Sequence, residues 1–418
     1  MSRPAAAAPD PISRPTPRAD RIAALDAVRG FALAGVLFAN LPLFAGHPYM
    51  TGAQLAALPT AALDTLAHAA MQLLVEDKFM GLFALLFGVG AALQLARARA
   101  QGAAGVRLHV RRMAWLFAIG SVHGWLFWSF DILRFYALWG LLLPLFDRLR
   151  PRALLAWGLL AGVAVPAAWR AAVAALAPAA PLSSVQVPRP RLLEAFAAGD
   201  YLEALAANWA FDWQLTLSPT QGAYQAGVLG RMLLGVWLGR RLLETGLPAR
   251  GTLLRGIAWT LPLGLAGSAV YAGLLGPRPG TIWRALPVEI GTLALTISYL
   301  AAALVVWQSR PAGRPLALLV PVGRMSLTNY LLQTAFGLWL FYGYLPGPGL
   351  MGRLGAAALV PLWAAVFAAQ VALSHAWLHR FAFGPVEWLW RSLAYGRPQP
   401  WRLPAAAAPA NGAVSPAT

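Results

Sequence analysis

Long apolar runs alternate with short polar segments along most of the chain. A helix that crosses a bilayer needs about 20 mostly apolar residues. The pattern predicts an all-α fold, a polytopic integral membrane protein with about ten transmembrane helices. The predicted spans are 26–45, 79–97, 113–129, 132–147, 153–176, 222–240, 255–275, 285–307, 316–342 and 355–378.

Three of these runs have features that predict a local departure from a long straight helix. Pro166 and Arg170 interrupt the fifth, which predicts a kink or an early end because proline lacks the N–H of a helical hydrogen bond. The third and fourth runs are short and are separated by Ser129-Phe130-Asp131, which predicts a tight hairpin.

The charged residues between the runs predict the orientation. Short cytoplasmic loops are enriched in Lys and Arg. Arginines gather in the connections that follow even-numbered spans, whereas most acids lie in the odd-numbered ones. The connection between spans seven and eight departs from this, since it holds Arg278 and Arg284 without an acid. We expect both termini to be cytoplasmic and the protein to lie in the plasma (inner) membrane.

The sequence divides into three parts, and two longer external segments lie within the second. We expect a disordered cytoplasmic arm at 1–24, one transmembrane domain at 25–395 and a disordered cytoplasmic tail at 396–418. Within the domain, 46–78 and 178–221 are the predicted external segments. Apolar residues recur at helical spacing in the first, which predicts an amphipathic helix on the bundle. The second begins with several prolines and then predicts a helix around Leu192–Asn208.

Composition agrees with a membrane protein. The chain is 59% hydrophobic and 11% charged, whereas soluble domains carry about 25% charged residues. Lipid is therefore the expected covering. The net charge of +18 lies in the loops rather than in one basic patch, which favours topogenic charge and no nucleic-acid partner. With no cysteine, the sequence excludes disulfides, thiolate catalysis and cysteine metal ligands.

Polar residues inside the spans are the functional candidates. An ionisable group in hydrocarbon costs about 3 kcal/mol, so such groups usually face the protein interior. Asp26 and Arg29 are three residues apart and share a helix face, and Asn40 lies on the same stripe eleven residues further along. The first two could equally form a purely structural pair. Lys78 is the only lysine in the chain, which suggests a role for a primary amine or an ion pair.

His123 and Asp131 form the strongest candidate for acid–base chemistry. His123 is the only histidine well inside a predicted span. Asp131 follows in the next turn, where it could cap the fourth span or hold the imidazole in one tautomer and raise its basicity.

Further candidates lie in three later spans. Arg231 in span six and Glu289 in span eight are possible counter-ions. In span nine, Arg324 precedes a polar stripe that contains Asn329 and that could join helices by hydrogen bonds. His375 and His379 have helical metal spacing, but no third ligand is evident, so no metal site is predicted. The hypothesis is that the polar residues converge on one internal site.

These motifs resemble the bacterial multi-pass membrane proteins of the YeiB type, which are grouped under a domain of unknown function. The segments that carry the resemblance are Leu25-Asp26-Ala27-Val28-Arg29-Gly30-Phe31-Ala32, Lys78-Phe79, Leu85-Leu86-Phe87-Gly88-Val89-Gly90, Gly120 with His123, Asp131-Ile132-Leu133 with Tyr136-Ala137, Gly140, Gly323-Arg324-Met325-Ser326-Leu327-Thr328-Asn329-Tyr330 and Gly384-Pro385-Val386-Glu387-Trp388-Leu389-Trp390-Arg391.

The Leu-Asp-x-x-Arg-Gly opening is also similar to that of integral membrane acyltransferases that modify surface sugars, and of the lysosomal glucosaminide N-acetyltransferase. In the O-acyltransferase pattern a histidine stands near the position of Asn40. The resemblance therefore implies another base here, either His123 or the external His47.

Three functions compete at this point. The first is acyl transfer from an acyl-CoA donor to a small-molecule or glycan acceptor, with His123 as base, Asp131 orienting it and Arg231 or Arg324 stabilising charge. The second is a transporter or flippase for a small anion, lipid or metabolite, and the third a non-catalytic scaffold. Protein partners stay open. The predicted substrate-binding residues are Asp26, Arg29, Asn40, Lys78, Arg231, Glu289, Arg324 and Asn329.

Overall fold

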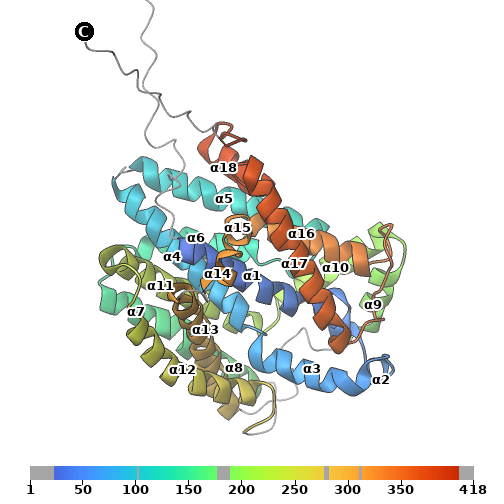
Figure 1. Ribbon diagram of the computed structural model, residues 1–418. Helices are drawn as coiled ribbons and strands as arrows, with labels where there is room; N and C mark the ends of the chain where they lie inside the picture. Colours follow the sequence, from blue (N-terminus) through green and yellow to red (C-terminus); the bar gives the residue numbers. More distant parts are fainter. Residues whose placement is uncertain (1–22, 101–102, 177–188, 277–281, 310–312, 404–418) are drawn as a thin grey trace, which may run out of the picture.

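The computed structural model describes residues 23–100, 103–176, 189–276, 282–309 and 313–403. Within these ranges the chain is helical and contains no strand, apart from an isolated bridge between Phe381 and Arg402. The all-α prediction is therefore confirmed. The helices form one bundle, with the last helix and the described end of the chain on the same side (Figure 1).

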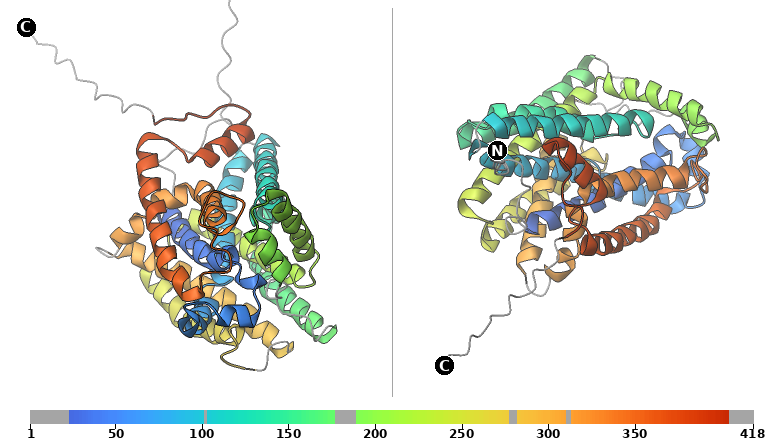
Figure 2. Two further views of the ribbon diagram at one scale, coloured as in Figure 1. Left: turned by 90° about the vertical axis from the view of Figure 1, so that its right-hand side faces the viewer. Right: turned by 90° about the horizontal axis from the view of Figure 1, so that it is seen from above.

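Helix α1 (Ala23–Phe44) runs through the centre of the bundle (Figures 1 and 2). It contacts α4 (Lys78–Ala100), α15 (Val320–Arg324), α16 (Ser326–Phe341) and α17 (Ala356–Arg380). Most of its residues are buried, as expected for a helix that is apolar all round. Its polar residues Asp26 and Asn40 are thereby held inside the protein.

Glycines allow α4 to pack closely on α11 (Gln221–Thr245). A Cβ atom on Gly88 would lie 2.0 Å from the carbonyl oxygen of Met232, and one on Gly235 would lie 2.0 Å from that of Leu85. Small residues at such contacts let helix backbones approach each other in membranes. The motif that contains Gly88 therefore has a structural role between these helices.

The outer helices expose large apolar side chains. Trp259 on α12 (Arg250–Tyr271) is 82% exposed, and Leu373 on α17 is 61% exposed. Extended apolar surfaces mark contact with lipid or protein. Six helical stretches of the described chain are long and apolar enough to cross a membrane, which identifies a membrane protein. They are Ala23–Tyr49, Ala61–Arg99, Pro151–Leu176, Arg250–Tyr271, Ala285–Gln308 and Ala356–Arg380.

The ninth predicted span, 316–342, is wrong as a single helix. The structure divides it into α14 (Gly313–Ala317), α15 and α16. Pro321 stands in the first turn of α15, where its missing N–H is tolerated. Met325 then leaves the helical region with ψ 30° and separates α15 from α16.

The fifth predicted span does not end early at Pro166 or Arg170. Helix α7 (Pro151–Leu159) passes into a π-helical turn, η4 (Leu160–Ala164), and α8 (Val165–Leu176) continues to the predicted end of the span. Pro166 is the second residue of α8, and π turns and prolines are the usual causes of a changed helix direction. Arg170 follows on α8.

The remaining helices follow the predictions with shifted bounds. α5 (Ala103–Leu126) and α6 (Leu133–Phe146) form the expected hairpin, and α3 (Ala61–Leu74) is the helix expected in the first external segment. The helix expected around Leu192–Asn208 is divided into two, because Asp200 caps a new helix by accepting the N–H groups of Leu202 and Glu203. The other elements are η3 (His47–Tyr49), α2 (Gly52–Ala56), α9 (Pro190–Ala197), α10 (Tyr201–Thr216), η6 (Ile282–Arg284), α13 (Ala285–Gln308) and α18 (Pro385–Tyr395).

The ordered chain extends beyond the predicted domain boundary at residue 395. Trp401 packs edge-on against Trp388, with ring centroids 4.7 Å apart, and contacts Phe381 at 5.4 Å. Residues 396–403, which were predicted to belong to a disordered tail, therefore pack against the helical domain. The N-terminal arm up to residue 22 and residues 404–418 lie outside the described residues, as does Arg278 in the connection before α13.

Candidate functional site

His123 and Asp131 form a buried pair at the end of α5. The His123 Nδ1 atom lies 2.7 Å from Asp131 Oδ2, and Nε2 lies 3.0 Å from the hydroxyl oxygen of Thr334 on α16. His123 is 5% exposed and Asp131 2%. A neutral imidazole in this arrangement donates from Nδ1 to the carboxylate and accepts the hydroxyl proton at Nε2. The geometry is that of a hydroxyl, a base and an orienting acid.

The hairpin between α5 and α6 positions this pair. Asp131 Oδ1 also accepts the N–H of Arg134 at 2.9 Å, so the carboxylate both caps the first turn of α6 and holds the histidine. A Cβ atom on Gly120 would lie 2.4 Å from the Arg134 nitrogen and 2.9 Å from Asp131 Oδ1. The glycine therefore allows α5 to approach the turn closely enough for the pair to form.

Helix α10 stabilises the α5–α6 hairpin through hydrogen bonds and an ion pair. Asn208 accepts the N–H of Ser129 at 2.8 Å and donates to the carbonyl of Gly124 at 2.9 Å. Asp212, one turn later, forms a buried ion pair with Arg134, whose Nη1 lies 2.9 Å from Asp212 Oδ2. Sequence reasoning missed these partners and Thr334. The helical spacing of Asn208 and Asp212 was the signal that could have identified them.

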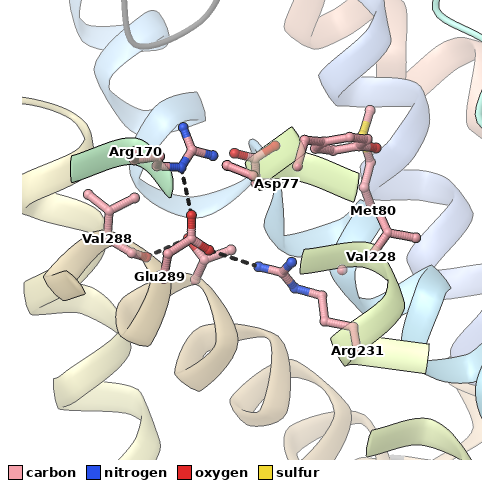
Figure 3. A pocket seen from close by; sticks show the side chains of 11 residues that line it. Asp77, Met80, Arg170, Val228, Arg231, Val288 and Glu289 are labelled. Carbon is pink, nitrogen blue, oxygen red and sulfur yellow. Dashed lines mark hydrogen bonds and ion pairs between the residues drawn. The ribbon is translucent and has the colours of Figure 1, made fainter. Parts of the chain in front are cut away.

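A second polar cluster surrounds Glu289 on α13. Arg170 Nε lies 2.7 Å from Glu289 Oε1, and Arg231 Nη2 lies 3.8 Å from Oε2. Figure 3 shows the Glu289 carboxylate between the two guanidinium groups, with Asp77 facing the same space. The predicted pairing of Arg231 with Glu289 is present, and Arg170 joins it. Sequence reasoning had treated Arg170 only as a break in an apolar run.

The cluster lines a small cavity. The volume that is open to the centres of water molecules is about 20 Å³. A cavity needs roughly 10–15 Å³ of such volume to hold one water. Tyr224 and Thr292 add hydroxyl groups to its wall. The enclosed part accepts a small polar group rather than a whole organic molecule.

Two glycines make room for the Arg231 side chain. A Cβ atom on Gly81 would lie 2.9 Å from Arg231 Nε, and one on Gly227 would lie 2.5 Å from Nη1. The Nε atom is buried and has no hydrogen-bond partner among the described residues. The buried guanidinium group of Arg231 therefore lacks a hydrogen-bond acceptor for at least its Nε–H group within the described ranges.

The predicted site residues do not all line this cavity. Arg231 and Glu289 line the cavity, whereas His123, Asp131 and Asn40 do not. The two clusters nevertheless adjoin through Met80 on α4. Its carbonyl oxygen accepts the Tyr136 hydroxyl at 2.9 Å, and its sulfur lies 3.6 Å from the hydroxyl of Tyr224.

Three other candidates on α1 and α4 belong to separate contacts. Arg29 Nη1 pairs with Asp26 Oδ1 at 2.7 Å, as the structural alternative expected. Lys78 is fully buried, donates to the carbonyl of Gln72 at 2.5 Å and lies over the ring of Tyr271. Lys78 is not among the residues that line the charged cavity.

Asn40 lies between the apolar side chains of α1 and is 3% exposed. Its Oδ1 atom has no hydrogen-bond partner in the described part of the chain. One turn later, the ring of Phe44 stacks on that of Trp128, with centroids 4.1 Å apart, and the Trp128 ring is 6.5 Å from the His123 ring. Asn40 thus lies on the side of α1 that approaches the His123 region.

Arg324 and Asn329 take part in the packing of α15, α16 and α17. Asn329 Nδ2 donates to Ser374 Oγ at 2.9 Å, and Arg324 Nη2 donates to the carbonyl of Ala382 at 3.4 Å. A Cβ atom on Gly323 would lie 1.8 Å from the carbonyl oxygen of Asp26. The start of α1 therefore meets the Gly-Arg-Met-Ser motif directly, and the interhelical role expected for Asn329 is present.

The C-terminal motif meets the same region through Glu387. This buried carboxylate accepts the N–H groups of Leu327 and Thr328 at 2.7 and 3.0 Å and the Thr328 hydroxyl at 2.5 Å. It thereby satisfies free donors in the first turn of α16. Burial raises the pKa of Glu387, and these hydrogen bonds oppose the increase. Three motifs far apart in the sequence therefore form one structural junction.

Comparison with known proteins places this arrangement in a family. Residues 238–397 match a family model described as "Protein of unknown function (DUF418)". The chain is 31% identical to the uncharacterized protein YxaH of Bacillus subtilis (strain 168) over 93% of its length and 97% of that protein. It is 30% identical to the uncharacterized protein YeiB of Escherichia coli (strain K12), over 90% of the chain and 96% of YeiB. A 39.9 kDa protein of Bacillus acidopullulyticus is also 30% identical, over 91% of the chain.

Proposed function

We propose that this chain, which belongs to the family of the uncharacterized proteins YeiB and YxaH, is an integral membrane acyltransferase with His123 as general base. The observation that carries the proposal is the contact of one imidazole with both a carboxylate and a hydroxyl. Nδ1 lies 2.7 Å from Asp131 and Nε2 lies 3.0 Å from Thr334. Histidine is the side chain whose ordinary pKa best suits proton transfer near neutral pH.

The chemistry follows from these positions. The hydroxyl or amine of an acceptor takes the place beside Nε2 that the Thr334 hydroxyl holds in the structure. As the acceptor attacks the acyl carbonyl carbon of a thioester such as acyl-CoA, its proton passes to His123 Nε2. The carbon–sulfur bond then breaks, and the leaving thiolate takes that proton. Asp131 stabilises the imidazolium formed between these steps.

The experiment measures release of free thiol from acyl-CoA by the purified protein in nanodiscs, with and without an added sugar acceptor. We expect His123→Gln to lower the rate by about 100-fold or more, which is the usual contribution of general base catalysis. His375→Gln is the matched control, because that histidine is outside the His123 pair and its ring nitrogen Nε2 lies 2.9 Å from the Leu318 carbonyl oxygen. A His123→Gln protein as active as the control would refute the proposed base.

The proposed topology determines from which side of the membrane the acceptor and the acyl donor enter. Ten crossings with both termini at the cytoplasmic face of the plasma (inner) membrane agree with the gathering of arginines after even-numbered spans. Reporter fusions at residues 150 and 210 test it. A cytoplasmic reporter should be active at the first position and an external one at the second, and the reverse result would overturn the orientation.

Transport of a small polar solute is a second candidate, favoured by the charged cavity. Four ionisable residues of both signs line it: Asp77, Arg170, Arg231 and Glu289. Ionisable groups inside a membrane bundle often mark a solute or proton pathway. Uptake into proteoliposomes that is abolished by Arg231→Gln and needs no acyl donor would support transport over acyl transfer.

A further inference from the structure

Helix α10 closes the end of α5, the helix that carries His123. The last three carbonyl groups of α5, at residues 124–126, lie in the final turn, where helical carbonyls have no partner within the helix. Each accepts a hydrogen bond from a side chain of α10, and the donors are Asn208 at 2.9 Å, Trp209 at 2.7 Å and Tyr201 at 2.9 Å. Helix α10 therefore caps α5 directly after His123.

The same helix lies beside the ends of two more helices. Asp212 forms a buried ion pair with Arg134 in the first turn of α6. Helix α10 ends at Thr216, and α11 begins at Gln221. Spanning helices end where they leave the hydrocarbon, and the proposed topology places these ends at the external face. Helix α10 has 16 residues, whereas a spanning helix needs about 20. It is therefore at the level of the external bilayer surface and does not cross the membrane.

One exposed side of α10 is apolar. Its residues recur at intervals of seven, four and four positions, which places them on one face of the helix and its last turn. They are Leu202, Trp209, Trp213 and Leu217, and we call them the apolar stripe. Leu202 is 72% exposed and Trp213 65%. Burial of apolar surface contributes about 25 cal/mol per Å², so a stripe of this size is stabilised by an apolar partner.

A second exposed side of α10 is polar. Glu203 follows Leu202 and Gln214 follows Trp213, and both polar residues are exposed. Each is rotated by about 100° from its apolar neighbour, because 3.6 residues make one helical turn. The third side, which contains Asn208, packs against the protein. A helix with one apolar and one polar exposed side fits the boundary between hydrocarbon and water.

The apolar stripe continues the exposed apolar surface of α5. Val122 is 52% exposed and Trp125 48%, and the two lie three residues apart on one face of α5. The carbonyl group of Trp125 accepts the indole N–H of Trp209 at 2.7 Å, so the two apolar surfaces adjoin. Extended apolar surface marks contact with lipid or protein, and tryptophan is enriched at the membrane–water interface. Lipid is therefore the partner that fits both surfaces.

We propose that α10 is an interfacial helix of the outer leaflet. The apolar stripe lies among the lipids, Glu203 and Gln214 face water, and the buried side holds the α5–α6 turn that carries the His123 pair. The bilayer surface is thus a partner of the protein that helps to position His123. The proposal shares the external placement of α10 with the proposed topology but involves no acyl chemistry, so its failure is distinguishable from a failure of acyl transfer.

The test places a nitroxide spin label on each exposed side of α10. The chain contains no cysteine, so Trp213→Cys and its matched control Gln214→Cys each give a single labelling position. In liposomes, the collision of the label with oxygen, which partitions into lipid, is compared with its collision with a water-soluble nickel chelate. We expect the label at 213 to lie about 5–10 Å inside the head-group boundary and the label at 214 to lie in water.

Two results would overturn the interfacial position. One is equal access of the nickel chelate to both labels, which means that the apolar stripe faces water. The other is low access of both reagents at 213 together with dipolar broadening between labels, which means that a second copy of the chain covers the stripe. If Trp213→Cys does not fold, Leu202→Cys and Glu203→Cys repeat the comparison one end of the helix away.

Hydrogen exchange in nanodiscs tests the positioning of the His123 turn. Trp213→Glu places a charge in the apolar stripe, whereas Gln214→Glu places the same charge on the polar side. We expect the backbone amides of residues 124–134 to exchange faster in Trp213→Glu than in Gln214→Glu, because α10 then leaves the lipid and holds the turn less firmly. Equal exchange in the two variants would overturn the role of the bilayer in positioning His123.

Discussion

Replacing Glu387 by alanine is expected to loosen the junction of α18 with the start of α16. The carboxylate accepts three hydrogen bonds, from the Leu327 and Thr328 N–H groups and from the Thr328 hydroxyl, at 2.5–3.0 Å. Each buried donor left without an acceptor costs about 1 kcal/mol or more. Three such donors give about 3 kcal/mol.

Part of this loss is offset, because the substitution also removes a carboxyl group whose ionised form is disfavoured by burial. We therefore expect a net destabilisation of about 2–3 kcal/mol. For a large domain this corresponds to a fall in the unfolding midpoint of roughly 4 °C or more.

The assay is thermal unfolding of purified protein in detergent, followed by tryptophan fluorescence. Glu387→Gln is the matched control, since its amide oxygen can still accept the two backbone N–H groups, and it should unfold close to the wild type. The reasoning would be refuted if Glu387→Ala unfolded at the same temperature as Glu387→Gln.

Three further outcomes follow from the contacts described. Burial raises the pKa of Glu387 above its ordinary value of 4.5. The stabilising contribution of this carboxyl group is therefore fully present below pH 4.5 and is lost as the pH rises through the raised pKa. From pH 4.5 toward neutrality, the melting temperature of Glu387→Gln should accordingly rise relative to that of the wild type. Gly323→Ala should destabilise the protein by about 2 kcal/mol or more in the same assay, because its Cβ would lie 1.8 Å from the Asp26 carbonyl oxygen; an unchanged midpoint would contradict this contact. Arg134→Met should cost about 3 kcal/mol by leaving Asp212 buried and unpaired, and Arg134→Met combined with Asp212→Asn should recover part of that loss in a double-mutant cycle.

The sequence predicted the membrane character and the helical fold because both depend on apolar runs that are local in the chain. The fifth span departs from a regular α-helix at a π-helical turn before Pro166 and then continues to Leu176, so proline alone did not indicate an end. It failed at 316–342, where apolar residues continue across Met325 although the backbone leaves the helix. An apolar run records burial or lipid contact and does not record a break that tertiary contacts impose.

The candidate sites show the same limit. The contact of His123 with Asp131 could be predicted because the two residues flank one short turn. Thr334, which contacts His123, is distant in sequence, so no spacing rule indicates it. Asp212 pairs with Arg134, and only its helical spacing from Asn208 indicates it. Not all of the predicted site residues line one cavity, because buried polar residues also reduce their free-energy cost by pairing locally. Local pairing is sufficient for Asp26 with Arg29 and requires no common cavity.

The most direct measurement of the proposed function is kcat/KM for acyl-donor cleavage in the wild type and in Asp131→Asn. If Asp131 orients His123 and stabilises the imidazolium formed during the reaction, the variant should lose about 100-fold or more in kcat/KM. An Asp131→Asn protein with the wild-type kcat/KM would contradict the account.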